Sequence, residues 1–223
     1  MLRLTLVVSC CLCVGVSYGA QLPLDAPLAA PDLHIPGTAI PYAVDEYKGK
    51  LELVPIHHST VSVNRHFGAN WFKGTTESIF YRPEMTTKIP GQHARVQLHT
   101  LTPVLYMHID VDPEGDNGGK NALTEKIALL HLKIAKDHRR VSKLTTNAWG
   151  GHAKRNDGVV KIRIESLPGG WIRVTRVEPL SPGEYAVSAM PQNQAFFETN
   201  VYDFGINKDA PENKEAITSD ASN

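Results

Sequence analysis

Apolar side chains recur mainly at every second position between residues 47 and 206, which is the period of a β-strand. In residues 101–111, for example, Leu105, Met107 and Ile109 alternate with Tyr106 and His108. About ten such segments lie between Gly, Pro, Asn and Asp residues; they are 50–54, 60–63, 77–81, 94–99, 101–111, 130–134, 139–146, 160–164, 171–177, 185–189 and 201–206. This pattern predicts a single all-β domain over residues 47–206, an antiparallel β-sandwich of immunoglobulin-like or jelly-roll-like form.

One segment of the domain also fits a helix. Residues 123–136 are rich in Ala, Leu, Lys and Glu, which favour helix, and Thr124 is placed to cap its start. The alternation of Leu130, Leu132 and Ile134 with polar neighbours favours a strand instead. We therefore expect one short helix at most, near residues 123–130.

The two ends of the chain differ from the domain in composition. Residues 20–46 contain five prolines, which fix φ and remove backbone donors, so an extended arm is predicted there. Residues 207–223 are rich in Asp, Glu, Asn, Ser and Lys, and Ile217 is their only large aliphatic residue. Such a segment has little apolar area to offset the entropy of ordering, so a disordered polar tail is predicted.

The first 19 residues have the pattern of a cleavable export signal. Arg3 gives a short positive region, residues 4–16 are apolar and uncharged, and Ser17 and Gly19 fit a cleavage site after Gly19. The apolar run is too short to span a membrane comfortably. A lipoprotein box at residues 7–10 is the alternative, but it would leave too short a signal, so we expect no lipid anchor.

Cysteine and charge content exclude several classes of function. All three cysteines lie within the predicted signal, so the mature protein would have no disulfide, cysteine nucleophile or Cys-ligated metal. The chain carries 23 basic and 23 acidic residues and has no basic stripe, which argues against nucleic-acid binding. An export signal with no disulfides suits a bacterial periplasmic or extracellular protein.

Two motifs occur in order near the C-terminus of the domain. They are L-x-P-G-E-Y-A over residues 180–186 and Y-D-F-G-I over residues 202–206, preceded by a charged hairpin at residues 130–140. In residues 75–206 the chain resembles uncharacterised exported bacterial proteins that carry an L-x-P-G-E-Y-A motif followed by [FY]-D-F-G-[IV]. The resemblance implies an exported β-domain and brings no activity, ligand or catalytic residue. The chain departs from that group in its histidine-rich strands.

The best candidate for metal binding is the run from His108 to Asp112. On a strand, His108, Asp110 and Asp112 project from one face, and an imidazole with two carboxylates suits a divalent ion. Asp110, Asp112 and Gly115 also match part of a calcium loop, although Asn121 stands where that loop needs a bidentate Glu. The alternative is a solvated strand face that runs into a turn. We expect Ca²⁺ or another divalent metal if this run binds one, and otherwise no cofactor.

Other candidate sites are weaker. The chain has ten histidines, but none is spaced in a motif that would pre-arrange metal ligands, so a histidine site would need convergence from different strands. No nucleophile elbow or P-loop is present. Trp149, in the segment Asn147–Gly151, is the best candidate for an exposed aromatic contact with a ligand.

These observations favour a non-enzymatic binding module or envelope-associated module with a protein or an envelope glycan as partner. The first alternative is a metal-dependent enzyme with histidines converging inside the β-fold. The second is a glycan-binding module that uses exposed aromatic side chains. No catalytic residue is assigned.

Overall fold

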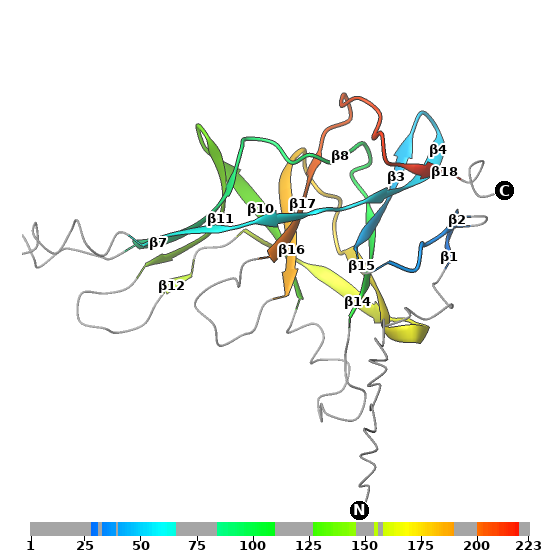
Figure 1. The fold of residues 1–223 in the computed structure, drawn as a ribbon, viewed down its shortest axis with the longest axis horizontal. Helices are drawn as coiled ribbons and strands as arrows, with labels where there is room; N and C mark the ends of the chain where they lie inside the picture. Colours follow the sequence, from blue (N-terminus) through cyan, green and yellow to red (C-terminus); the bar gives the residue numbers. More distant parts are fainter. Residues whose placement is uncertain are drawn as a thin grey trace, which may run out of the picture.

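The computed structural model describes residues 28–30, 33–38, 40–65, 84–109, 127–145, 154–155, 158–189 and 200–218 (Figure 1). The fold is an all-β sandwich, as the alternating pattern predicts. Its strands are β1 (Leu28–Ala30), β2 (Leu33–His34), β3 (Tyr42–Tyr47), β4 (Lys50–Pro55), β5 (His58–Thr60), β6 (Ser62–Arg65), β7 (Glu84–Pro90), β8 (Gln97–Leu98), β9 (Val104–His108), β10 (Ile127–Ile134), β11 (His138–Thr145), β12 (Lys154–Arg155), β13 (Val159–Val160), β14 (Ile162–Ser166), β15 (Trp171–Arg176), β16 (Gly183–Ala189), β17 (Asn200–Ile206) and β18 (Ile217–Thr218). A 3₁₀ turn, Pro168–Gly170, joins β14 to β15. No helix in the described residues is long and apolar enough to cross a membrane.

One layer is a six-stranded sheet in the order β14-β15-β9-β3-β4-β18. All its pairs are antiparallel, and β3 and β4 form a hairpin through Lys48 and Gly49. Its outer face is covered by the chain from β1 to Ile35, where Leu33 and Ile35 pack on Tyr42, Leu53 and Trp171. Its inner face packs on the second layer.

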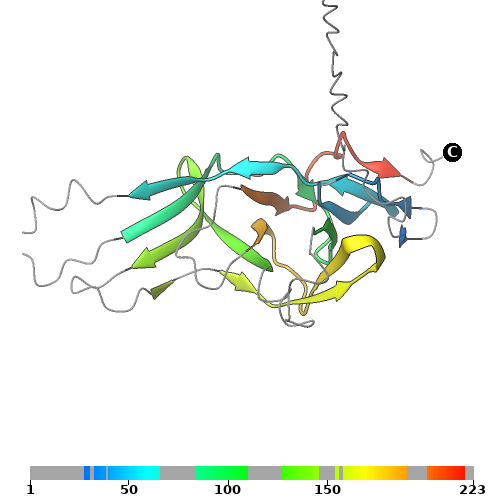
Figure 2. The same ribbon diagram turned by 60° about the horizontal axis from the view of Figure 1, so that its bottom comes forward.

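The second layer is a sheet in the order β5-β17-β16-β10-β11-β7-β6, which we call the curled sheet. β5 and β6 lie at opposite ends of this strand order but are separated in sequence only by Val61. The sheet must therefore curl round until its two edge strands meet at Val61. β10 and β11 pair only next to their shared turn and then diverge, as Figure 2 shows, and β12 and β13 pair with them beyond that point. The short β8 joins β17 in a parallel pair.

The curled sheet is buried on both of its faces where it meets the other layer. Ala128 and Leu130 of β10 pack inside the curl with Ile89, Val141 and other apolar residues. Ile127 and Leu129, on the opposite face of the same strand, pack between the two layers. A strand covered on both sides needs no polar alternation, which is why residues 127–130 read as an uninterrupted apolar run.

That double burial corrects the prediction of a helix near residues 123–130. Residues 127–130 are the first half of β10, while residues 123–126 lie outside the described part of the chain. The other predicted strands are found at or near their expected places. The segment 94–99 is reduced to β8, and 77–81 lies outside the described residues.

The structure also corrects both predicted ends of the domain. The predicted arm, 20–46, overlaps β3, which is a central strand between β9 and β4. The strand can form there because the last proline of the arm is Pro41, so every residue of β3 keeps its backbone N–H donor. The predicted disordered tail is ordered over residues 207–218, where β18 pairs with β4 and Asn213 donates a hydrogen bond to the Gln97 carbonyl. Specific hydrogen bonds order this polar segment. The predicted signal, 1–19, lies outside the described residues.

Candidate functional site

Of the three residues predicted from the sequence to bind a metal, the structure describes only His108. His108 ends β9, and its Nε2 lies 3.0 Å from the Gly169 carbonyl oxygen while its ring packs edge-on against Trp171. Because a carbonyl only accepts, Nε2 carries the hydrogen and His108 anchors the turn at residues 168–170. Asp110 and Asp112 lie outside the described residues, as does Trp149, so those sites stay predictions.

A different cluster of ionisable side chains is buried between the layers. Asp45 of β3 and Glu52 of β4 are direct cross-strand partners, and His99 follows β8. These residues are 1%, 2% and 9% exposed, respectively, and one ligand-type atom from each lies within 4.8 Å of the others. Two carboxylates directly opposite each other repel, so this pair needs hydrogen-bond donors or positive charge from its neighbours.

Asp45 receives that compensation almost completely. Its Oδ1 accepts hydrogen bonds from the backbone N–H groups of His99, at 2.9 Å, and Thr100, at 2.8 Å. Its Oδ2 lies 2.7 Å from Nδ1 of the His99 ring. Asp45 therefore holds the segment after β8 against the β3–β4 hairpin.

Both ring nitrogens of His99 have oxygen partners. Nε2 lies 3.2 Å from the carbonyl oxygen of Ala210, which can only accept, so Nε2 carries a hydrogen. Nδ1 faces the Asp45 carboxylate, and a lone pair there would meet a second lone pair. A hydrogen shared between Nδ1 and Oδ2 accounts for the 2.7 Å contact.

Glu52 is the unsatisfied member of the cluster. Its Oε1 is buried and has no hydrogen-bond partner among the described residues. Burial and the nearby Asp45 carboxylate raise the pKa of Glu52 above its ordinary value, although the Asn213 amide and His99 oppose this. One buried carboxylate oxygen of the cluster is therefore left without a partner among the described residues.

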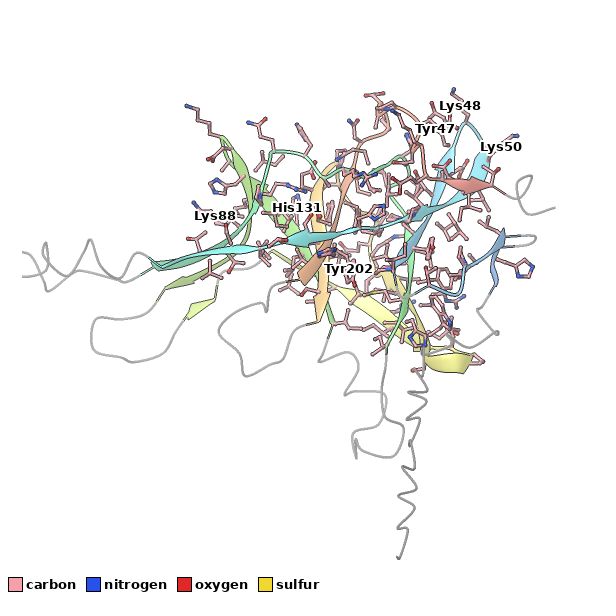
Figure 3. All side chains as sticks on the ribbon, viewed as in Figure 1. Tyr47, Lys48, Lys50, Lys88, His131 and Tyr202 are labelled. Carbon is pink, nitrogen blue, oxygen red and sulfur yellow. The ribbon has the colours of Figure 1, made fainter. Side chains whose placement is uncertain are left out.

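The β3–β4 turn lies beside the cluster. The Tyr47 ring packs against the His99 ring with centroids 4.4 Å apart, and Nζ of Lys48 lies 4.7 Å from the Tyr47 ring centroid. Figure 3 shows Tyr47, Lys48 and Lys50 grouped at this turn. Aromatic and aliphatic groups thus cover the cluster on this side.

A cleft of about 250 Å³ opens near the cluster, and we call it the Arg95 cleft. It is lined by Val54, Pro55, His57, Arg95, Val96, Gln97 and residues 211–215. The apolar lining comes from Val54, Pro55, Val96 and Pro211, and the other lining residues are polar or charged. The Asn213–Gln97 hydrogen bond, 3.0 Å long, ties the two walls together.

A carboxylate of the chain itself sits in the Arg95 cleft. Glu215 bonds through Oε2 to Nε2 of His57, at 2.6 Å, and through Oε1 to Nη2 of Arg95. The hydrogen bond from His57, together with the charge of Arg95, lowers the pKa of Glu215. Arg95 and His57 are 73% and 37% exposed, so the pair is open to solvent.

A second buried polar group has a structural role. Arg139, inside the curled sheet, donates hydrogen bonds to Asp203, to Glu184 and to the carbonyl oxygens of Gly91 and Pro90. Glu184 also accepts hydrogen bonds from the Ala94 N–H, at 2.7 Å, and from the Gln97 amide, at 3.2 Å. All three side chains are nearly inaccessible, so this cluster closes one end of the curled sheet instead of presenting a site.

The histidines do not gather in the described part of the chain. The cluster of Asp45, Glu52 and His99 contains a single imidazole, and His57, His93 and His138 lie apart at partly or fully exposed positions, each beside a carboxylate. Sequence reasoning missed this cluster and the Arg95 cleft. The polar residues at inward positions of β3 and β4 were the available signal, and only the strand register shows that Asp45 faces Glu52.

Comparison of the chain with protein-family models, with curated proteins and with solved structures found no significant match.

Proposed function

We propose that this protein is an exported bacterial binding module that acts without catalysis and takes up a ligand carboxylate in the Arg95 cleft. The observation that supports this most directly is Glu215, which occupies a carboxylate position between Arg95 and His57. Arginine and histidine side chains that already hold one carboxylate can hold another of the same geometry. Glu215 then competes with the ligand carboxylate for Arg95 and His57.

The lining of the cleft favours a particular ligand class. Next to the Arg95–His57 pair, Val54, Pro55 and Val96 offer an apolar surface. A short peptide with a free C-terminal carboxylate and an apolar last side chain fits both features. Peptide C-termini of this kind are available to a protein outside the cytoplasm.

Binding can be tested directly with small peptides. We expect N-acetyl-Ala-Leu with a free carboxylate to shift the amide NMR signals of residues 95–97 and 211–215, and its C-terminal amide to leave them unchanged. Glu215→Gln should bind the acid about two- to fivefold more tightly, and Arg95→Gln should bind it weaker by a similar factor, as expected for exposed ion pairs. Arg163→Gln is the matched control, since Arg163 is exposed on β14 at the far edge of the six-stranded sheet.

Two results would contradict the proposal. One is equal binding of the acid and the amide, and the other is unchanged affinity in both Glu215→Gln and Arg95→Gln.

Export is tested separately. Cleavage after Gly19 predicts a mature protein whose N-terminal residue is Ala20.

The cluster of Asp45, Glu52 and His99 gives little support to the alternative of a metal-dependent enzyme. With exposures of 1%, 2% and 9%, its side chains leave no path for a substrate. The glycan-binding alternative depends on Trp149, which lies outside the described residues.

A further inference from the structure

We infer that Asp45, Glu52 and His99 form a closed binding site for one divalent transition-metal ion. The site is separate from the Arg95 cleft and does not depend on the function proposed for it. Its three ligands come from β3, β4 and the segment after β8.

The cluster gathers two buried carboxylates around one imidazole nitrogen. One divalent ion would offset the charge of both carboxylates. In the metal-free alternative a hydrogen bond joins His99 Nδ1 to Asp45, and metal binding by the full chain separates the two states.

One carboxylate oxygen of Glu52 is unpartnered. Glu52 is 2% exposed, and its Oε1 has no hydrogen-bond partner among the described residues. A buried carboxylate oxygen without a donor is costly. A metal ligand bond would satisfy it, and the other two ligand atoms lie within 4.8 Å.

The second ring nitrogen of His99 fixes the orientation of the imidazole. Its Nε2–H donates to the Ala210 carbonyl oxygen at 3.2 Å, which leaves Nδ1 as the nitrogen directed at the carboxylates. Metal-binding histidines usually donate their second N–H to a carbonyl or carboxylate, because this fixes the tautomer and the ring orientation. Ala210 supplies that partner here.

The chemistry of the ligands selects the class of metal. One imidazole with two carboxylates suits Zn²⁺ and similar transition ions better than Ca²⁺ or Mg²⁺, which prefer oxygen ligands alone. Tetrahedral ligands of Zn²⁺ lie roughly 3.4 Å from one another. Zn²⁺ binding therefore requires two small movements. The Glu52 carboxylate must turn toward the other two ligands, which lie within 4.8 Å, and Asp45 Oδ2 and His99 Nδ1, now 2.7 Å apart, must separate to that spacing.

The site would act structurally. His99 holds Ala210, and Asn213 is hydrogen-bonded to Gln97, so an ion in the cluster would fasten the segment from residue 207 to 218 onto the sandwich. An ion that binds only the folded protein raises its melting temperature.

The test is metal binding by the full chain, purified without an affinity tag. We expect about one Zn²⁺ per chain after equilibrium dialysis, and a rise in melting temperature of about 5–10 °C at a hundredfold excess over Kd, reversed by EDTA. Glu52→Gln and His99→Gln should lose both effects. His138→Gln should keep them, since His138 pairs with Asp137 at the surface.

Glu52→Gln is the decisive variant, because it keeps the size and shape of the side chain and removes its negative charge, so it should fold. Co²⁺ gives a second readout, since its visible absorption should show tetrahedral coordination in the wild type and not in Glu52→Gln. The inference is overturned if the wild type retains no Zn²⁺, or if Glu52→Gln and the wild type respond equally. Arg95→Gln should bind Zn²⁺ normally, which keeps this result independent of the peptide experiment.

Discussion

Arg139 of β11 donates a hydrogen bond through Nη1 to the carboxylate of Asp203 on β17, inside the curled sheet. The same nitrogen lies 3.3 Å from Oε2 of Glu184 on β16. Glu184 belongs to the L-x-P-G-E-Y-A motif and Asp203 to the Y-D-F-G-I motif, while Arg139 comes from the charged hairpin before them. One buried guanidinium thus links all three segments on which the resemblance depends.

Replacing Arg139 with Leu should destabilise the protein strongly. The substitution leaves Glu184 and Asp203 buried beside each other without a cation, and breaking a buried ion pair in this way costs about 3–5 kcal/mol. Urea unfolding followed by circular dichroism measures the free energy. Arg173→Leu is the control, because its partner Glu165 is half-exposed and such a pair contributes about 1 kcal/mol at most. Equal losses in the two variants would contradict the structural role of Arg139.

The sequence predicted a strand over residues 201–206, and β17 confirms it. Phe204 and Ile206 lie on one face of this strand and are buried between the layers. Asp203, on the opposite face, is buried as well. Alternation reveals which residues share a face, but only the closure of the curled sheet shows that both faces are covered.

The candidate sites were harder to predict for a related physical reason. Asp45 and Glu52 lie on the two strands of one hairpin, but His99 is far from them in sequence, and no local motif joins the three residues. Their meeting depends on the β3–β4 register and on the ordered segment after β17. That segment was expected to be disordered from its lack of apolar residues, since composition reports apolar area and not specific hydrogen bonds.

The C-terminal segment should therefore contribute to stability. Deleting residues 207–223 removes the Ala210 partner of His99, the Asn213–Gln97 bond, the Glu215 pair and the β18–β4 pairing. At about 1 kcal/mol for each hydrogen bond, the melting temperature should fall by roughly 5–15 °C. A shorter deletion, 219–223, removes none of these contacts and should leave the melting temperature unchanged. Equal melting of the two truncated proteins would show that the segment is dispensable.

Gly183, the first residue of β16, is a position where a side chain should be poorly tolerated. Its φ is +152°, a value that L-residues rarely adopt, and an added Cβ would lie 2.7 Å from Nε2 of His131. Gly183→Ala should lower the free energy of unfolding by more than about 1 kcal/mol. Gly37→Ala is the matched control, since an added Cβ there meets nothing within 4 Å. Thermal unfolding of both variants compares them, and an unaffected Gly183→Ala would contradict the geometry.

The raised pKa of Glu52 predicts how stability depends on pH in metal-free protein. In the unfolded chain Glu52 ionises near its ordinary value of 4.5, whereas burial and Asp45 make the folded state hold the proton to higher pH. Between those two values the folded state binds more protons, so this residue's contribution to stability falls as pH rises through the folded pKa. Glu52→Gln stays neutral at every pH, and its stability relative to the wild type in EDTA should therefore increase with pH above 4.5. Chemical unfolding of both proteins at several pH values measures this difference, and a difference that is constant or decreases with pH would show that Glu52 ionises freely in the folded protein.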